Sequence, residues 1–259
     1  MNKVPVPGFF TRIFAVWWRH LRVYSGSLFS NATPPFLEPL IFLAGVGLGL
    51  GQYVGDMNGS KYVEFLAVGL IVTSSMYTAA FENTFGTFIR LEFDKVYDGM
   101  IASSLTARDL LVGEILFTAT KGAFFSLASL IVLNFFGLVP SWWTWLAVFI
   151  GFLTAAMFSV LSLLVTSFVR NINHFNFYFT LFISPLFFFS GVVFPLEQLP
   201  PTLLPVAFTL PLTHSVAIVR ALGAQTLVWD DLWHLGYIVL FILVIGALAI
   251  RQLGKRLVS

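Results

Sequence analysis

Charged residues and cysteine are what this sequence most lacks. Asp, Glu, Lys and Arg together make up 10% of its 259 residues, whereas about 25% is usual in a soluble domain. This deficit excludes an ordinary soluble protein, and a formal net charge of only +2 gives no indication of a nucleic-acid-binding surface. Because cysteine is absent, the chain has no disulfide, no thiol nucleophile and no cysteine-bound metal.

Motifs for nucleotide binding and hydrolysis are absent as well. The glycine run from Gly45 to Gly51 is not followed by Gly-Lys-Ser or Gly-Lys-Thr, so it is not a phosphate-binding loop. Ser190-Gly191 lacks the Gly-x-Ser-x-Gly pattern of a hydrolase elbow. The histidines lie in separate segments without a metal-ligand partner at helical spacing, which predicts no metal site. They are His20, His174, His214 and His234. We therefore expect a non-catalytic chain without a cofactor of its own.

Hydrophobic residues make up 58% of the chain, which includes 30 Phe. Apolar runs recur at about the 20 residues that an α-helix needs to cross a bilayer. The sequence therefore predicts an all-α polytopic membrane protein, with residues 1–259 forming one domain of six transmembrane helices. The predicted spans are residues 33–53, 62–88, 109–136, 142–168, 174–194 and 233–250. In the first span, glycines four residues apart, Gly45/Gly49 and Gly47/Gly51, would let another helix approach closely.

Residues 1–31 do not have the pattern of a cleavable signal peptide, because basic residues are spread among the apolar ones. Between Phe9 and Tyr24 the apolar residues recur at helical spacing, and the arginines lie largely off that stripe. This pattern predicts an amphipathic helix in the headgroup plane of the membrane. The alternative is a basic leader without structure. The apolar residues are Phe10, Ile13, Phe14, Trp17 and Leu21, and the arginines are Arg12, Arg19 and Arg22.

The segment after the fifth span is rich in proline yet still apolar. Each proline lacks an N–H group and clashes with the preceding helical turn, so the chain must break repeatedly. Irregular backbone in a membrane survives only where protein buries it or where it lines a wet cavity. We therefore predict that residues 195–222 form re-entrant half-helices between spans five and six. The prolines are Pro195, Pro200, Pro201, Pro205 and Pro211.

The distribution of Lys and Arg predicts the orientation of the chain, because cytoplasmic loops carry the excess of these residues. With six spans and both termini in the cytoplasm, only Lys61 and Arg220 fall outside. The inner side then holds Lys3, Arg12, Arg19, Arg22, Arg90, Lys95, Arg108, Arg170, Arg251, Lys255 and Arg256. If the proline-rich segment spanned fully, the basic carboxy-terminal tail would face outward, so this bias supports the re-entrant interpretation.

The inner loop from Arg90 to Arg108 combines charged residues with apolar ones at helical spacing. The apolar residues are Phe93, Val96, Tyr97, Met100 and Ile101. This pattern predicts a short amphipathic helix against the membrane or a partner, although an ordinary solvated connection remains an alternative.

Few ionisable residues fall within the predicted spans, where each costs about 2.5–3.5 kcal/mol at a helix centre, and four of them are candidates for a function. They are Glu38, Glu82, Glu114 and Lys121. Side chains tilt toward the amino terminus of their own helix, and spans two and three are antiparallel. An ion pair of Lys121 with Glu82 or with Glu114 is therefore expected, either along a transport pathway or as a structural clamp.

The sequence between residues 190 and 220 resembles the carboxy-terminal signature of type-2 ABC export permeases. The matching residues are Ser-Gly-Val-Val-Phe-Pro at 190–195, Gln-Leu-Pro at 198–200, Leu-Pro-Leu-Thr-His-Ser at 210–215, and Arg220. Further segments resemble the permeases that export nodulation lipo-oligosaccharides. They are Glu38-Pro39-Leu40-Ile41 with the glycines after it, Phe81-Glu82-Asn83-Thr84, Gly113-Glu114 and Ala119-Thr120-Lys121. The resemblance extends from about Pro35 to the end of the chain.

This resemblance implies a homodimer in a bacterial inner membrane, with two copies of a separate ABC ATPase that binds ATP and magnesium. It places a coupling helix for the ATPase in the loop between spans two and three, with Asp94, Lys95, Tyr97 and Asp98 as candidates. The expected substrate is a lipid or a lipid-linked saccharide, moved past Glu82, Glu114 and Lys121. An outer gate is expected in the re-entrant segment, with Pro195, Pro200, Pro211, His214 and Arg220 as candidates.

Other functions remain as alternatives. A drug-efflux permease of the same superfamily would share these features. An ion-coupled secondary transporter would also use broken helices and intramembrane carboxylates, but the sequence lacks the two inverted repeats typical of such proteins. A membrane-embedded enzyme acting on lipid is disfavoured, because the sequence shows no catalytic constellation.

Overall fold

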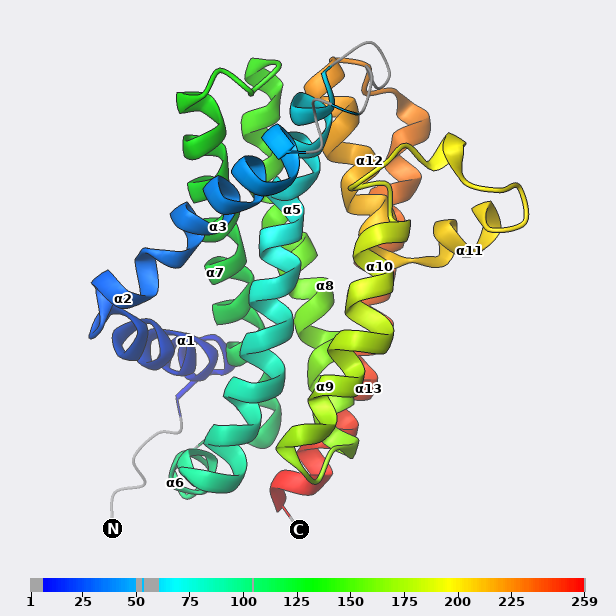
Figure 1. Ribbon diagram of the computed structural model, residues 1–259. Coiled ribbons are helices and arrows are strands. Elements are labelled where there is room, and N and C mark those ends of the chain that lie inside the picture. Colours follow the sequence, from blue (N-terminus) through cyan, green and yellow to red (C-terminus); the bar gives the residue numbers. More distant parts are fainter. Residues whose placement is uncertain (1–6, 50–52, 54–60, 104, 259) are drawn as a thin grey trace, which may run out of the picture.

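The computed structural model describes residues 7–49, 53, 61–103 and 105–258. These residues form helices joined by turns, with no strand among them (Figure 1). Among the described residues, five helices are long and apolar enough to cross a membrane. They are Tyr62–Phe93, Ala107–Phe135, Trp142–Phe168, Ile172–Phe189 and Trp229–Leu257. Their positions match the second to sixth predicted spans, and the last helix is longer than the sequence pattern predicts.

The predicted first span is only partly covered by the described residues. α3 (Pro34–Phe42) continues as the π-helical segment η1 (Leu43–Leu48), and this run is shorter than the five long helices. Residues 50–52, including Gly51 of the predicted glycine pairs, lie outside the described residues. A Cβ atom added at Gly45 or Gly49 would meet nothing within 4 Å. Among the described residues, no helix therefore approaches this pair closely.

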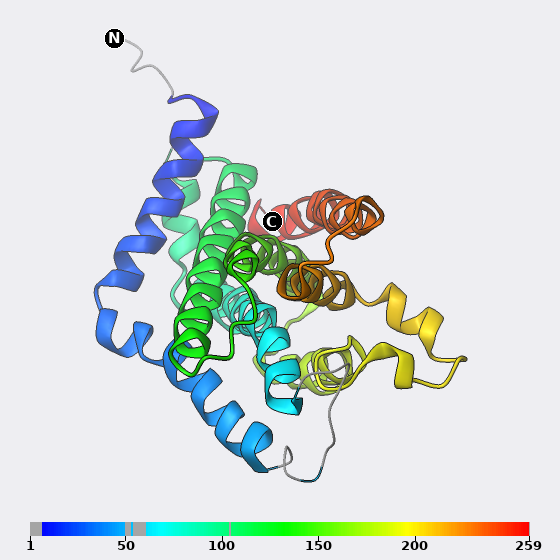
Figure 2. The same cartoon turned by 90° about the horizontal axis from the view of Figure 1, so that it is seen from above.

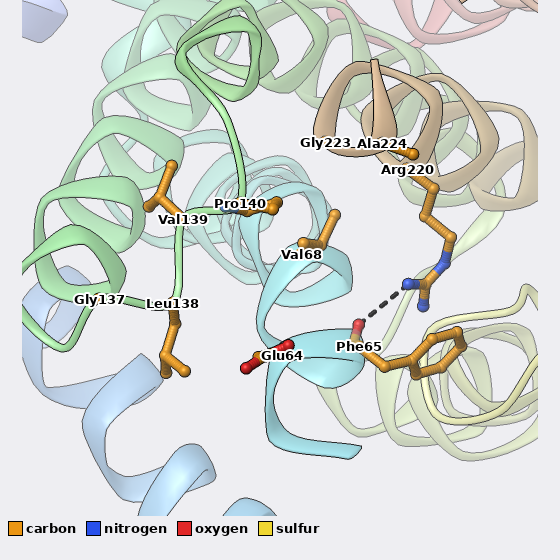
Figure 3. A pocket seen from close by; sticks show the side chains of 10 residues that line it. All are labelled: Glu64, Phe65, Val68, Gly137, Leu138, Val139, Pro140, Arg220, Gly223 and Ala224. Atoms are coloured by element: carbon orange, nitrogen blue, oxygen red, sulfur yellow. Dashed lines mark hydrogen bonds between the residues drawn. The ribbon is translucent and has the colours of Figure 1, made fainter. Parts of the chain in front are cut away.

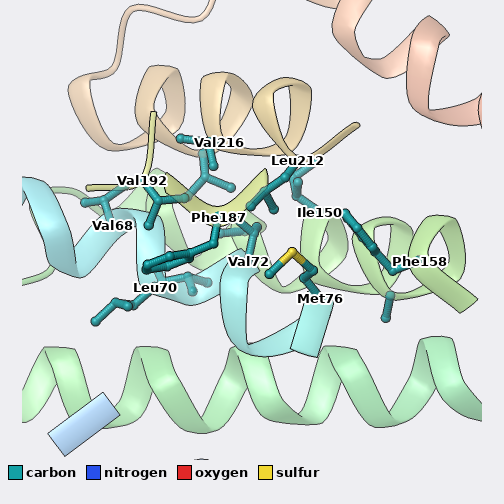
Figure 4. Close-up of a cluster of buried hydrophobic side chains, with 14 of the residues drawn as sticks. Val68, Leu70, Val72, Met76, Ile150, Phe158, Phe187, Val192, Leu212 and Val216 are labelled. Carbon is teal, nitrogen blue, oxygen red and sulfur yellow. The ribbon is translucent and has the colours of Figure 1, made fainter. Parts of the chain in front are cut away.

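α5 (Tyr62–Phe81) is the central helix of the bundle, and it packs against α7 (Ala107–Phe135), α8 (Ala147–Phe168) and α12 (Pro211–Ala224). Figure 4 shows apolar side chains from α5, α8, α12 and the segment 187–192 meeting in one core, in which Val72, Met76 and Phe158 are fully buried. Lipid is as apolar as these side chains, so close packing rather than exclusion from water holds such helices together.

Small residues allow this close packing where α5, α7 and α8 meet. A Cβ atom added at Gly122 would collide with Ala155, and one at Gly151 would collide with Ser126. The Ser75 hydroxyl donates a hydrogen bond to the Gly122 carbonyl oxygen at 2.8 Å. Within the described residues, Gly122 and Gly151 of the third and fourth spans thus lie where helices approach closely.

The long helix Tyr62–Phe93 changes its geometry after α5. It continues into two π-helical segments, η2 (Glu82–Gly86) and η3 (Ile89–Phe93), in which the turns are wider than in an α-helix. Lys95 then adopts a left-handed conformation with φ of 53° and starts the short helix α6 (Val96–Ile101). The long helix that begins at Tyr62 therefore extends beyond residue 88, and Arg90, which the sequence pattern assigned to a loop, lies within it.

α1 (Phe9–Ser25) lies across the lower part of α7, and α2 (Leu28–Ala32) connects it to α3 (Figures 1 and 2). Arg12 Nε lies 2.8 Å from Asp109 Oδ2, and Trp17 Nε1 donates to Thr120 Oγ1 at 2.8 Å. A Cβ atom added at Gly113 of α7 would lie only 2.6 Å from Val16 Cβ. α1 thus packs tightly on α7 through one face while large apolar side chains remain exposed on the other, namely Phe10, Phe14 and Trp18.

The fourth of the five long helices, Ile172–Phe189, ends before the outer end of the bundle. α9 (Phe175–Tyr178), η6 (Phe179–Ile183) and α10 (Ser184–Phe189) are continuous and end at Phe189. The chain then passes through η7 (Leu196–Gln198) to α11 (Leu204–Thr209), which projects to the side of the bundle in Figure 1. α12 returns alongside α5, and α13 (Leu232–Val258) runs back to the end where α6 lies. The remaining short helices are η4 (Trp142–Leu146), η5 (Ile172–His174) and η8 (Trp229–Asp231).

Candidate functional site

Four charged side chains form one network between the lower part of the long helix Tyr62–Phe93 and α7. Glu82 Oε1 lies 2.7 Å from Arg90 Nη1, and Glu82 Oε2 lies 2.6 Å from Lys121 Nζ. The other terminal nitrogen of Arg90 pairs with Glu114. Positive and negative groups therefore alternate in the order Lys121, Glu82, Arg90 and Glu114. The two carboxylates balance the two cations.

Of the two ion pairs expected for Lys121, the structure forms the one with Glu82. Glu114 pairs with Arg90 instead and also accepts a hydrogen bond from the Thr87 hydroxyl at 2.7 Å. Glu82 and Arg90 are eight residues apart, a separation that a regular α-helix would offset by about 80° around its axis. The wider turns of η2 and η3 bring eight residues close to two full turns. This local change of helix geometry explains why the spacing in the sequence did not reveal the pair.

Tyr97 joins α6 to this network. Its hydroxyl lies 2.7 Å from both carboxylate oxygens of Glu114 and accepts a hydrogen bond from Arg90 Nε at 3.2 Å. Burial raises the pKa of Tyr97, and the neighbouring Glu114 carboxylate raises it further. The hydroxyl therefore stays protonated and donates to Glu114.

The other candidate coupling residues lie at the surface of the same turn. Asp94, Lys95 and Asp98 are exposed, and Lys95 Nζ lies 3.6 Å from Glu92 at a solvent-accessible position. Phe93, expected on the apolar face of a helix, is 64% exposed, whereas Tyr97 is fully buried. α6 therefore presents a charged surface outward and anchors itself inward through Tyr97.

A pocket of about 670 Å³ lies beside the charge network, between α3, α5 and α7. Glu82 and Lys121 form part of its wall, and Glu38 adds a third ionisable group. The rest of the wall is aromatic or small: Phe42, Tyr77, Thr78, Phe81, Gly86 and Phe125. The pocket therefore combines charged groups with large apolar rings, which an amphipathic molecule would match.

α1 covers the charge network where α1 packs on α7. Lys121 Nζ lies 5.0 Å from the centre of the Tyr24 ring, within the range of a cation–π contact. His20 stacks on Phe117 with ring centres 5.2 Å apart, and burial lowers the pKa of His20 to about 4. The imidazole is therefore neutral at pH 7 and adds no charge next to Arg90.

Arg220 occupies the opposite, outer part of the bundle, where Figure 3 shows its guanidinium group turned toward Phe65. Nη1 donates to the Phe65 carbonyl oxygen at 3.0 Å and Nη2 to the Gly191 carbonyl oxygen at 2.7 Å. The guanidinium carbon lies 3.5 Å from the centre of the Phe65 ring. Among the described residues, no carboxylate forms an ion pair with Arg220. The group also lines a pocket of about 440 Å³ with Glu64 and the turn at 137–140.

The remaining gate candidates surround the broken segment. Pro195 precedes η7, Pro200 lies between η7 and α11, and Pro211 is the first residue of α12. His214 Nδ1 lies 2.8 Å from Nδ1 of His234 on α13, and His214 Nε2 lies 3.0 Å from the Phe208 carbonyl oxygen. These two histidines lie in separate segments of the sequence, and only the packing of α13 against α12 brings them together. Among the described residues, no group of three His, Cys, Asp or Glu side chains is placed to hold a metal ion.

Long apolar helices with buried ion pairs between them define a multi-pass membrane protein. The family model described as "ABC-2 type transporter" matches residues 11–224, so the chain belongs to the ABC-2 type transporter family. The family expected from the sequence motifs is thereby confirmed.

Several curated proteins are similar to this chain over most of its length. Nodulation protein J of Rhizobium leguminosarum bv. trifolii is 33% identical over 256 residues, which cover 97% of this chain and 96% of that protein. Nodulation protein J of Neorhizobium galegae is 34% identical over 248 residues, covering 94% and 93%. The inner membrane transport permease YadH of Escherichia coli K12 is 24% identical over 188 residues, covering 72% and 73%.

Proposed function

We propose that this chain is the membrane-spanning permease subunit of an ATP-driven exporter that moves a lipid-linked oligosaccharide or polysaccharide out of the cytoplasm. Membership of the ABC-2 type transporter family supports the transport role. The relatives named Nodulation protein J align with nearly the whole chain. Together with the resemblance of the Glu82 and Lys121 segments to lipo-oligosaccharide permeases, they support the substrate class.

The pocket beside the charge network is the observation that carries this proposal. A lipid-linked saccharide has an acyl part that prefers the bilayer and a polar part that cannot cross it unaided. The aromatic rings of Phe42, Phe81 and Phe125 suit the apolar part, and Glu82 with Lys121 offers hydrogen-bonding groups to the polar part. In the bilayer, ionisable groups usually lie at such a functional surface or form an ion pair. Glu82 and Lys121 do both, because they pair with each other and line the pocket.

The assembly that we propose is a homodimer of this permease with two copies of a separate ATPase subunit, which would bind ATP and magnesium. α6 is the proposed contact with the ATPase, with Asp94, Lys95 and Asp98 presented outward and Tyr97 fixing the helix to the bundle. This arrangement needs no cofactor in the permease itself.

The proposed topology places the chain in a bacterial inner membrane with six spans, α3 and η1 belonging to the first, and both termini in the cytoplasm. α6 and the carboxy-terminal end of α13 lie at the same end of the bundle (Figure 1), which agrees with this orientation. Segment 195–222 would then re-enter from the outer side through α11 and return through α12, forming the outer gate.

Transport in membrane vesicles tests the proposed function. Inverted vesicles that contain the permease and its ATPase should take up a fluorescent lipo-oligosaccharide when ATP is present. Glu82→Gln and Lys121→Met should reduce uptake more than they reduce the amount of folded permease. Glu64→Gln is the matched control, because Glu64 lies at the opposite end of α5 and away from the pocket. If both pocket variants export normally, these residues are neither path nor clamp.

The absence of cysteine allows a clean test of topology. A single Gly254→Cys substitution near the end of α13 should react with a membrane-impermeant maleimide only after the cells are opened. Labelling from outside intact cells would overturn the cytoplasmic assignment of the carboxy terminus.

A hydrophobic small molecule is the second candidate substrate, because aromatic rings make up much of the pocket wall. ATP-dependent uptake of an apolar dye without uptake of the lipo-oligosaccharide would favour this drug-efflux function. Uptake driven by a proton or sodium gradient without ATP would instead indicate a secondary transporter.

A further inference from the structure

A continuous chain of side-chain contacts connects α6 to the pocket. The Tyr97 hydroxyl touches both Glu114 and Arg90, Arg90 bridges Glu114 and Glu82, and Glu82 holds Lys121 at the pocket wall. Tyr97 and Glu114 are fully buried. The side chains of Glu82, Arg90 and Lys121 each expose less than a fifth of their surface. The two regions assigned to coupling and to transport are therefore in physical contact.

The two cations and two carboxylates of the network pair with one another. Among the described residues, none of its four charged members forms an ion pair with a residue outside the network. A displacement of Tyr97 therefore cannot be compensated by a surface charge, and it must change how Arg90 is shared between Glu114 and Glu82.

Arg90 has two discrete ways to satisfy its carboxylates. In the structure it divides its terminal nitrogens between Glu82 and Glu114, while Tyr97 satisfies Glu114 in part. If α6 moves and withdraws the Tyr97 hydroxyl, Glu114 loses a donor, and the planar guanidinium can turn to bind Glu114 with both nitrogens. Glu82 would then keep only Lys121. Lysine could not make this exchange, because its ammonium group is a point charge rather than a fork of donors.

We infer that Arg90 is a positioning residue that transmits the position of α6 to Glu82 and Lys121 at the pocket. This inference rests on the proposed exporter function. It assigns the link between coupling and transport to one guanidinium group and to the hydroxyl of Tyr97, which keeps that group shared between two carboxylates.

The natural absence of cysteine provides the reporter. Phe81 lies in the pocket wall and is 52% exposed, so a Phe81→Cys chain carries one reactive thiol beside Glu82. In vesicles that contain the ATPase, its rate of reaction with a maleimide dye is measured without nucleotide and after trapping with ATP and vanadate. We expect the two rates to differ in the otherwise unchanged chain. The difference should be lost when Tyr97→Phe or Arg90→Lys is added.

Tyr178→Phe is the matched control, because Tyr178 is another largely buried tyrosine whose hydroxyl hydrogen-bonds only Ser162 among the described residues. This variant should keep the nucleotide-dependent difference in labelling rate. Thermal unfolding of every variant separates loss of stability from loss of transmission. Tyr97→Phe removes a single oxygen atom, so it remains informative if Arg90→Lys does not fold.

The outcomes separate this inference from the proposed function. If the nucleotide-dependent difference survives in folded Tyr97→Phe and Arg90→Lys chains, Arg90 does not transmit the position of α6, although the exporter function stands. If Tyr178→Phe abolishes the difference as completely as Tyr97→Phe, the role of the Tyr97 hydroxyl is merely structural. If the parent chain binds no ATPase and shows no nucleotide effect, the exporter function itself fails.

Discussion

Arg90 and Arg220 are two largely buried arginines at opposite ends of the bundle, and they are satisfied in opposite ways. Arg90 is shared between two carboxylates and the Tyr97 hydroxyl. Arg220 donates to backbone carbonyl oxygens of Phe65, Gly191 and Val192, and it packs over the Phe65 ring. One cation is held by side chains that can rotate, whereas the other is held by backbone.

These two kinds of hydrogen-bond partner give the two ends of the bundle different freedom to rearrange. Side-chain carboxylates offer Arg90 alternative pairings, so the inner end can rearrange without unfolding. The carbonyl groups around Arg220 belong to the backbone after α10 and at the start of α5, so they cannot rotate as side chains do. Arg220 therefore connects the turn after α10 to α5 through hydrogen bonds.

Arg90→Met should destabilise the protein most. Glu114 would lose its only ion-pair partner among the described residues while remaining fully buried, and breaking a buried pair in this way costs about 3–5 kcal/mol. The free energy of unfolding in detergent, measured by denaturant titration, gives the value. Adding Glu114→Gln should recover part of the loss, because it removes the uncompensated carboxylate. A double variant that is less stable than Arg90→Met would contradict the assigned pairing.

Arg220→Met should cost less, about 2–3 kcal/mol, because it leaves carbonyl groups without a donor but strands no opposite charge. Here Glu197→Gln, added to the same chain, should recover nothing, since no ion pair with Arg220 exists among the described residues. Recovery by this second substitution would show that Arg220 is held by charge, as Arg90 is, and the comparison between the two ends would fail.

Lys121→Met should have a smaller effect on stability, about 1.5 kcal/mol, which is the lower value for a hydrogen bond to a charged group. Glu82 would still be paired with Arg90, so no carboxylate would be left alone. Differential scanning fluorimetry of the purified chain beside Arg90→Met provides the comparison. A loss as large as that of Arg90→Met would mean that Lys121, not Arg90, is the centre of the network.

Charge reversal at Asp94 and Lys95 should change the free energy of unfolding by less than about 0.5 kcal/mol, as is usual for exposed positions. The same double reversal should weaken association with the ATPase, because both side chains face outward from the turn before α6. Co-purification of the two subunits measures this association. Unchanged association and unchanged ATPase stimulation would remove these two residues from the proposed interface.

Much of the architecture could be predicted from the sequence, because long apolar runs and proline breaks act locally. The approximate positions of five long helices follow from such patterns, but the helix predicted to reach residue 194 ends at Phe189, before the first proline of the predicted break. The role of Arg90 could not be read in the same way. Its pairing with Glu82 depends on π-helical turns, and no residue pattern between them signals a change from α to π geometry.

Contacts between segments that lie far apart in the sequence could not be predicted either. His214 and His234 meet only because α12 and α13 pack side by side, and their spacing along the chain carries no periodic signal. Gly45 and Gly49 of the first span make no close helix contact among the described residues, for a related reason. Close packing depends on which faces meet, and the structure uses single glycines, Gly113, Gly122 and Gly151, where neighbouring helices press closest.

The two π-helical segments at the end of α5 also have a mechanical consequence. A widened turn holds about one residue more than an α-turn, so its conversion to α geometry would rotate everything beyond it by about 100°, the angle that one residue subtends. η2 and η3 lie between the tightly packed upper part of α5 and α6. Such a conversion would therefore turn the lower end of this helix, including Arg90, relative to its upper part.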